Sequence, residues 1–233
     1  MAGGPAAGGG RWVEVDPPRL SRWLAGFAQR HGRYDVAGMT GGIRLRAADG
    51  SVAECLAPPG AAECLAPPGA AGATDVDGFV ASAAEPRRLG LLLARRGGVA
   101  VGIAAGDALE VSKVDSRYVQ GRTAAGGWSQ QRFARRRENQ ARAAATDAAD
   151  LAVRLLLPAV DRLAAVVTGG DRRTVDTILA DARLAPVAAL RAQRFLTVGE
   201  PRLAVLEGAV RQARAVRIRL VEPDPAGMDP AGT

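Results

Sequence analysis

Three short apolar segments with glycine-containing turns between them constrain the fold more than any other feature of this chain. They read RLGLLLARR (88–96), GVAVGIAAG (98–106) and ALEVSKVD (108–115). Short runs rich in leucine, valine and isoleucine and bounded by glycine are typical of strands, and their close spacing predicts an antiparallel meander. RYVQGR (117–122) can continue the third strand.

Helical and strand patterns alternate after this meander. The predicted elements are a long helix (129–157), a strand (163–170), a helix (171–181), a segment with an ambiguous pattern that fits a strand (187–196), a helix (201–216) and a strand (216–222). A meander followed by such alternation predicts a mixed α/β sheet with helices on its faces. The order resembles an RNase H-like arrangement, and we expect residues 85–222 to form this domain.

The residues before this domain predict a smaller α+β unit. Residues 1–10 are rich in glycine and alanine, which favours disorder. We expect an N-terminal extension over 11–52 with a strand (11–16), a helix (18–32) and the first arm of a hairpin that turns at the Asp-Gly pair of RAADGS. Either the extension packs on the main core or it forms a small separate domain. The last residues, 223–233, read as a disordered tail.

A tandem repeat separates the two parts of the chain. AECLAPPGA occurs at 53–61 and again, unchanged, at 62–70, so we interpret 53–84 as a loop or linker. The repeat contains both cysteines, Cys55 and Cys64, and the chain has one histidine, His31. These three residues are too few for a zinc site of the usual four nitrogen and sulfur ligands, so we expect neither a metal nor a cofactor.

The composition of the chain limits the classes of partner that we expect. The formal net charge is +7 and 48% of the residues are hydrophobic, which suffices for an ordinary core. The charge invites a nucleic-acid partner, although all basic residues except Lys113 are arginine, which also suits a coding bias. We expect a cytoplasmic protein without a membrane partner, because the N-terminus lacks a signal-peptide pattern and no apolar run is long enough to span a bilayer.

The most informative segment is GGWSQQRFARRRENQARAAA (126–145). Glycines lead into a helix whose first residues, from Trp128 to Arg142, hold five arginines and one acid, Glu138. Ser129 is a suitable N-cap. A helix N-terminus carries unpaired N–H groups and a positive dipole end, so the segment can bind an anion. The alternative from physics alone is an arginine face in contact with solvent.

Glutamine is the residue of this segment that suits chemistry. Residues 121–145 contain no histidine, cysteine or lysine, so they cannot build an acid–base triad locally. A glutamine amide does not titrate near neutral pH, yet it can orient a water and donate to a developing oxyanion. Such positioning suffices for an activated ester, and the bond between a peptide and the 3′ end of tRNA is one.

Other polar groups have simpler interpretations. GGDRR (169–173) joins a strand to a helix where phosphate often binds, but an ordinary turn with Asp171 as N-cap is preferred. Asp107, Glu110 and Asp115 read as turn and surface residues rather than as a carboxylate cluster that holds two metals. His31 reads as a surface or helix-end residue.

The segment GGWSQQRFARRRENQA resembles the signature of the Vms-like release-factor (VLRF) family, in particular its actinobacterial peptidyl-tRNA hydrolase branch. Members of this family are related to the catalytic domain of archaeal and eukaryotic peptide-chain release factors. Their motif is a GxxQ loop before a basic helix, and Gly127-Trp128-Ser129-Gln130 fits it. The resemblance extends over about residues 85–222. It implies a release-factor-like catalytic domain and assigns the catalytic glutamine to Gln130 rather than to its neighbour Gln131.

The resemblance implies a hydrolase, a peptidyl-tRNA hydrolase of ribosome rescue and quality control. Its partners would be peptidyl-tRNA and the ribosome, in particular the large subunit. The implied catalytic residues are Gln130, Gly127 and Ser129, and the implied RNA contacts are Gly126, Trp128, Gln131, Arg132, Arg135, Arg136, Arg137 and Arg122. Two alternatives stay open: a tRNA endonuclease that cleaves near the CCA end, and a non-catalytic module that binds RNA or the ribosome. The oligomeric state is not set by the sequence.

Overall fold

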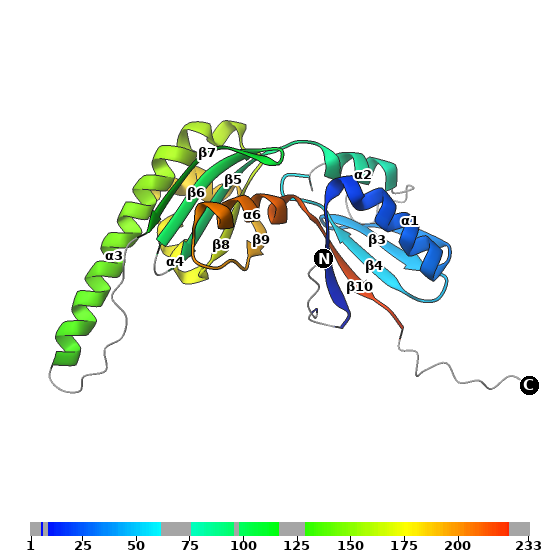
Figure 1. Ribbon diagram of the computed structural model, residues 1–233, viewed down its shortest axis with the longest axis horizontal. Helices are drawn as coiled ribbons and strands as arrows, with labels where there is room; N and C mark the ends of the chain where they lie inside the picture. Colours follow the sequence, from blue (N-terminus) through cyan, green and yellow to red (C-terminus); the bar gives the residue numbers. More distant parts are fainter. Residues whose placement is uncertain (1–5, 7–8, 62–75, 96–97, 117–128, 224–233) are drawn as a thin grey trace, which may run out of the picture. The chain divides into compact units, whose positions relative to one another are not determined.

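The structure is a computed structural model that describes residues 6, 9–61, 76–95, 98–116 and 129–223, the side chains of 116 and 129–141 excepted (Figure 1). The described residues form two compact units. The first unit combines the N-terminal part of the chain, up to Glu85, with the residues from Arg214 onward, and the second unit is Pro86–Ala213. The first unit is therefore discontinuous in sequence.

The first unit contains one antiparallel sheet of five strands and two α-helices. Its elements are β1 (Arg11–Val15), η1 (Pro17–Arg19), α1 (Leu20–His31), β2 (Tyr34–Met39), β3 (Gly42–Ala47), β4 (Val52–Leu56), α2 (Val76–Ala84) and β10 (Val216–Val221). The strand order is β1-β10-β4-β3-β2, and every neighbouring pair is antiparallel. The hairpin expected around the Asp-Gly turn is β3 and β4, with Arg46 opposite Val52.

Alternation along these strands places the core of the first unit on one face of the sheet. In β3, Ile43 and Leu45 are fully buried while Arg44 and Arg46 are exposed. Both helices supply side chains to the buried cluster, including Phe27 from α1 and Phe79 from α2. An antiparallel sheet with one packed and one solvated face has this pattern.

Strand β10 lies in a different place from the one that we expected. The sequence suggested that residues 216–222 close the sheet of the domain at 85–222, whereas β10 lies between β1 and β4 in the first unit. Its buried residues, Val216, Ile218 and Leu220, alternate with half-buried ones. This pattern suits the half-solvated sheet, whereas the central strands of the second unit are buried on both faces.

Two further elements of the first unit were not anticipated. Strand β2 extends the sheet beyond β3, and helix α2 occupies Val76–Ala84 within the range that we interpreted as a loop or linker. The first copy of the repeat contributes most of β4, with Ala53 and Cys55 buried. The second copy, at 62–70, lies outside the described residues.

The second unit is a mixed sheet of five strands with helices on both faces. Its elements are β5 (Arg88–Arg95), β6 (Gly98–Ala105), β7 (Ala108–Ser116), α3 (Ser129–Leu156), η3 (Leu157–Arg162), β8 (Ala165–Gly170), α4 (Arg172–Leu179), η4 (Ala182–Leu184), α5 (Ala185–Ala189), β9 (Arg191–Leu196) and α6 (Leu203–Arg214). The strand order is β7-β6-β5-β8-β9, and β6 alone runs opposite to the others. The meander and the expected mixed α/β sheet with helices on its faces are confirmed, and the RNase H-like arrangement stays a prediction.

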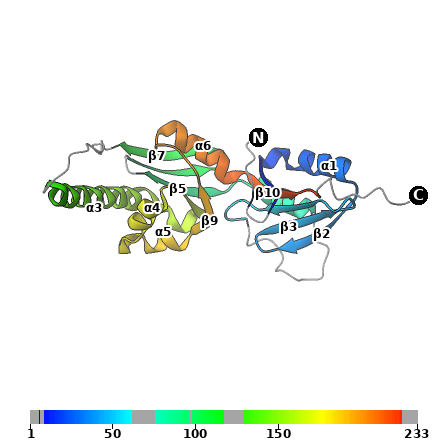
Figure 2. The ribbon, with the colours of Figure 1, turned by 90° about the horizontal axis from the view of Figure 1, so that it is seen from below.

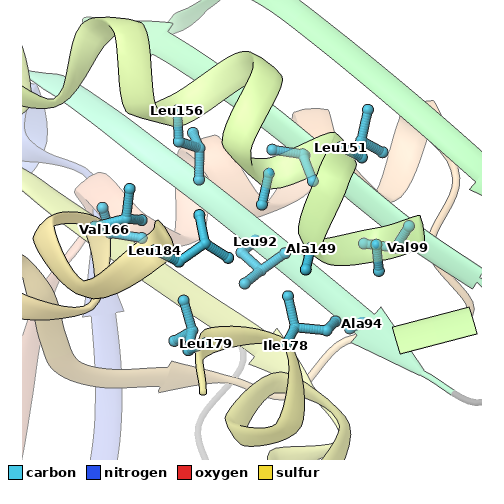
Figure 3. Close-up of a cluster of buried hydrophobic side chains, with 14 of the residues drawn as sticks. Leu92, Ala94, Val99, Ala149, Leu151, Leu156, Val166, Ile178, Leu179 and Leu184 are labelled. Atoms are coloured by element: carbon cyan, nitrogen blue, oxygen red, sulfur yellow. The ribbon is translucent and has the colours of Figure 1, made fainter. Parts of the chain in front are cut away.

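The two faces of this sheet explain the continuous apolar run of β5. Leu92 and Ala94 pack under α3 and α4, as Figure 3 shows, together with Leu156 and Ile178. The alternate residues of β5, such as Leu91 and Leu93, belong to a second cluster on the opposite face, where α6 supplies Leu206 and Val210. Because both faces are covered, nearly every residue of the strand is apolar.

Candidate functional site

Helix α3 carries the segment that the sequence singled out. It has 28 residues, which at about 1.5 Å per residue gives a length of about 42 Å. Figures 1 and 2 show that its N-terminal half extends beyond the sheet, and Figure 1 shows that its C-terminal half lies across the sheet. Buried residues occur at helical spacing in the packed half; they are Ala148, Ala149, Leu151, Ala152 and Leu156. The helix is thus held at one end.

The structure places the predicted site residues at the other end of this helix. Helix α3 begins at Ser129, so Gln130 lies in its first turn and the arginines at 132, 135, 136 and 137 follow within about two turns. The side chains of 129–141, including those of Ser129, Gln130 and Gln131, are outside the description. Arg122, Gly126, Gly127 and Trp128 also lie outside the described residues.

The backbone nevertheless fixes how far the first turn lies from the core along the helix. Ala148 is the first buried residue of α3 in the part whose side chains are described. Gln130 precedes it by 18 positions, or about 27 Å along the helix axis. The start of α3, with its positive dipole end, is therefore far from the packed sheet and can reach a partner of the protein.

The charge of α3 changes between its two halves. Residues 129–142 contain five arginines and one acid, Glu138, whereas residues 143–156 contain Asp147, Asp150 and Arg154. The basic residues thus gather in the half that extends beyond the sheet. A partner with many negative charges, such as RNA, suits that half of the helix.

An ion-pair network fastens the packed half of α3 to the rest of the second unit. Arg183 Nη2 donates to Asp150 Oδ1 at 2.8 Å and to Asp181 Oδ2 at 2.6 Å. The side-chain and backbone hydrogen bonds from Arg183 lower the pKa of Asp181 to about 2. Asp181 and then Asp150 raise the pKa of Arg183. The network joins α3 to η4.

The GGDRR turn between β8 and α4 is explained by its own structure. Asp171 is the N-cap of α4, as the sequence predicted, and its Oδ1 accepts from the Thr174 N–H at 2.8 Å. Gly170 has φ +99°, and a Cβ there would lie 2.3 Å from the Ala94 carbonyl oxygen. The glycine and the cap serve the turn, so the start of α4 is an ordinary strand-to-helix connection.

The acidic residues of the meander do not form a metal site. Asp107, Glu110 and Asp115 are exposed, and Glu110 accepts from Arg88 Nη2 at 2.5 Å. Within the described part of the chain, no group of three histidine, cysteine, aspartate or glutamate side chains is placed to hold a metal ion. The side chains therefore agree with the interpretation of turn and surface residues.

His31 has neighbours that invite comparison with a catalytic triad. Its Nδ1 lies 2.8 Å from Asp49 Oδ2 and 3.1 Å from Ser51 Oγ, and Ser51 is fully buried. A triad needs an accessible serine on one ring nitrogen and a hydrogen-bonded carboxylate on the other. Here the buried Ser51 and Asp49 both approach Nδ1, and the carboxylate beside Nε2, Glu222 Oε1, lies at 3.6 Å, beyond hydrogen-bond distance. The Ser51 N–H, and then His31, lower the pKa of Asp49. The group joins the end of α1 to the β3–β4 turn. His31 is the last residue of α1, and only 10% of its side-chain surface is exposed, so it is not a surface residue.

Cys55 is unsuited to nucleophilic or redox chemistry. It is fully buried in β4, and burial raises the pKa of its thiol to about 12. The thiolate is the reactive form, so this cysteine is inert in the folded protein. Cys64 lies outside the described residues.

One polar site was missed by reasoning from the sequence. A cavity of about 340 Å³ lies beside Thr168 of β8, and residues of α4 and β9 complete its lining. The available signal was a threonine in the otherwise apolar and glycine-rich strand AVVTGG, but such a residue is also common in ordinary strands.

In the described part of the chain, no helix has both the length and the apolar character that a bilayer crossing requires.

Comparison with known proteins places residues 87–219 in a family. This segment matches the model of the actinobacterial and chloroflexi VLRF1 release factor family. Two solved structures are similar to the chain: an archaeal protein (15% identity, TM-score 0.38, 87% of this chain and 66% of that one) and the archaeal translation termination factor aRF1 (17% identity, TM-score 0.39, 87% of this chain and 63% of that one). The chain thus spans slightly less than two thirds of each. No curated protein matches the sequence.

Proposed function

The chain belongs to the actinobacterial and chloroflexi VLRF1 release factor family, and from this membership we propose that it hydrolyses peptidyl-tRNA on stalled ribosomes in the cytoplasm. Membership of this family supports a release-factor-like role in translation. The match covers residues 87–219, which include all of the second unit from Arg87 on and the start of β10. The proposal adds the substrate, the reaction and the residues.

The observation that supports the reaction is the position of the GxxQ segment. Gly127-Trp128-Ser129-Gln130 leads directly into α3, and Gln130 is the second residue of that helix. The opposite half of α3 is held by a buried apolar face and by Arg183. A glutamine carried on a helix fastened in this way can be presented to the ribosome without loss of the fold.

In the proposed reaction, water attacks the carbonyl carbon of the ester that joins the peptide to the tRNA. The new bond is between the water oxygen and this carbon, and the bond to the 3′ oxygen of the tRNA breaks. That oxygen takes a proton as the peptide carboxylic acid forms. Gln130 orients the water and donates to the developing oxyanion, a role that needs no titratable group. Gly126 and Gly127 let the backbone approach the ester, and Ser129 begins the helix that carries Gln130.

The proposed RNA contacts follow the same segment. Trp128 has a ring suited to stacking on a base, Gln131 follows the proposed catalytic glutamine in sequence, and Arg122 precedes it by eight positions. The arginines at 132, 135, 136 and 137 pair with phosphates of the acceptor stem, because guanidinium groups match phosphate oxygens in pairs. Their place in the extended half of α3 supports this role.

The test is peptide release from purified ribosomes that carry peptidyl-tRNA. We expect Gln130→Ala to slow release by a factor of about 100 or more, the typical loss when one oxyanion donor is removed. Gln140→Ala is the matched control, since it removes the same amide from the same helix outside the proposed site, and it should stay within a few-fold of the wild type. Equal rates for the wild type and Gln130→Ala would contradict catalysis and favour a non-catalytic binding module.

The same reaction distinguishes hydrolysis from cleavage of the tRNA itself. Hydrolysis of the ester leaves the CCA end intact, whereas an endonuclease would shorten the tRNA. Electrophoresis of the released tRNA beside an intact standard measures this directly. A shortened tRNA would replace the hydrolase proposal with an endonuclease.

A further inference from the structure

A polar cavity lies between α4 and β9, on elements separate from the start of α3. Its volume is about 340 Å³. Residues of three elements face it: Thr168 from β8, Arg172 and Asp176 from α4, and Arg191, Gln193 and Phe195 from β9. All of these residues belong to the second unit, so the cavity is part of a single compact body.

An irregularity in β9 borders this cavity. Val166 faces Arg191 and Thr168 faces Phe195, so residues 192–194 of β9 lie opposite the single residue Val167. Extra residues make the strand bulge and redirect its side chains. Ala192 and Gln193, which line the cavity, belong to this bulge. Bulges of this kind occur often beside binding sites.

Thr168 is the strongest indication of a ligand. It is fully buried, it lines the cavity, and its Oγ1 has no hydrogen-bond partner among the described residues. A buried hydroxyl without a partner is costly and uncommon in folded proteins. A ligand oxygen inside the cavity would accept from this hydroxyl and remove that cost.

The arginines beside Thr168 are held by neighbours. The guanidinium carbon of Arg172 lies 4.2 Å from the centre of the Phe195 ring, a cation–π contact. Arg191 Nη1 donates to Asp176 Oδ1 at 2.6 Å. Each contact restricts the side chain of the arginine and leaves other guanidinium N–H groups available, since a guanidinium carries five donors.

The lining therefore offers more donors than acceptors. Two guanidinium groups, the Thr168 hydroxyl and the Gln193 amide can donate, whereas the one carboxylate, Asp176, already accepts from Arg191. Charges of two arginines and one aspartate leave the site positive. A group with several anionic oxygens satisfies such a set, and guanidinium groups favour phosphate among such groups.

We propose that this cavity binds the phosphate group of a nucleotide. Thr168 Oγ1 donates to one phosphate oxygen, and Arg172 and Arg191 donate to the others. The cavity volume lies in the range of pockets for small molecules, about 300–1,000 Å³, and leaves room for a sugar beside the phosphate. The site is made by side chains: the start of α4 is capped by Asp171 and takes no part.

Two sources can supply a nucleotide phosphate, a mononucleotide or the backbone of RNA. The test uses the whole protein and two probes, adenosine monophosphate and a labelled single-stranded RNA of eight nucleotides, with binding followed by calorimetry and fluorescence anisotropy. We expect Thr168→Val and Arg172→Gln each to weaken binding of the recognised probe by tenfold or more. Arg173→Gln, on the next residue of α4, is the matched control and should bind as the wild type does.

Thr168→Ser separates the hydroxyl from the packing of the strand. It keeps the hydroxyl, so binding should stay within a few-fold of the wild type, whereas Thr168→Val keeps the size and loses binding. Binding of the mononucleotide alone supports a free nucleotide, and Thr168-dependent binding of the RNA alone supports the RNA backbone. The proposal is overturned if neither probe binds, or if Thr168→Val binds as well as the wild type.

This inference does not rest on the proposed function. A Gln130→Ala variant that has lost peptide release should still bind the probe at the cavity, because Gln130 lies on α3 and none of the lining residues does. Loss of probe binding in Gln130→Ala would overturn the separate cavity site.

Discussion

Arg183 of η4 lies between two carboxylates. Its Nη2 is 2.6 Å from Oδ2 of Asp181, the N-cap of η4, and 2.8 Å from Oδ1 of Asp150, which belongs to α3. The Arg183 guanidinium thus joins the start of η4 to a residue of α3 that lies 33 positions earlier in the sequence. This contact lies in the half of α3 that packs on the sheet. Its electrostatic effect can be measured on Asp181.

Replacement of Arg183 should raise the pKa of Asp181. In the wild type this pKa is about 2, below the ordinary 3.8, because Arg183 donates to the carboxylate. A carboxyl whose folded pKa is lowered stabilises the fold above its unfolded pKa, and this contribution disappears as the pH falls from about 4 to 2. Arg183→Gln should return the pKa towards 3.8 and reduce the loss of stability over that range.

Carboxyl titration by NMR, together with urea unfolding at pH 2 to 5, measures both effects. Arg173→Gln provides a control on an exposed arginine that is absent from this network. An unchanged Asp181 pKa in Arg183→Gln would mean that the ion pair does not persist in solution.

Gly170→Ala should destabilise the second unit by about 2 to 4 kcal/mol. Gly170 has φ +99°, and an added Cβ would lie 2.3 Å from the backbone oxygen of Ala94, which cannot easily move within β5. Gly199→Ala is the matched control, because a Cβ there meets nothing within 4 Å and its φ is not in the positive range that disfavours side chains. Denaturant unfolding compares the two; equal effects would disprove the steric argument.

Cys55 should resist alkylation in the folded protein. Burial raises the pKa of its thiol to about 12, so almost no thiolate exists at pH 8, and the side chain is fully enclosed. Mass spectrometry after treatment with iodoacetamide should find Cys55 unmodified under native conditions and modified in 6 M guanidinium. A Cys64→Ser background keeps the other cysteine from obscuring the result. Rapid native alkylation would show that β4 opens readily.

The arginines of the extended half of α3 should control how binding to stalled ribosomal complexes depends on salt. If Arg135 and Arg136 each neutralise one phosphate, Arg135→Gln/Arg136→Gln should weaken binding. The slope of log K against log salt should also become shallower by about 1 to 2 units. Arg154→Gln, an exposed arginine of the packed half, is the control and should change neither quantity. Sedimentation at several salt concentrations measures the slopes; identical slopes would place the contacts elsewhere.

Local patterns predicted the parts of this fold that depend on local physics. The meander β5–β7 follows from short apolar runs between glycine turns, and α3 follows from a long helical period with Ser129 at its start. Asp171 was recognised as a cap because the carboxylate bonds within its own helix turn. These features depend on residues a few positions apart.

Features that depend on distant partners were not predicted. β10 pairs with β1 across about 200 positions, for example Val13 with Ile218, and no local pattern encodes that choice. The cavity at Thr168 is lined in part by a bulge whose register depends on two strands together. Gln130 was proposed as the catalytic residue from a motif resemblance. The structure describes its backbone and not its side chain, so its role stays a prediction.

The place of β10 has a consequence for the order in which the protein is made. Synthesis proceeds from the N-terminus, so β1, β4 and their helices emerge before the second unit, whereas β10, which lies between β1 and β4, emerges after it. Until then, β1 has no neighbour in the sheet and one edge of β4 is open. The second unit is complete before that strand arrives, so the unit that begins first is the one that finishes folding last.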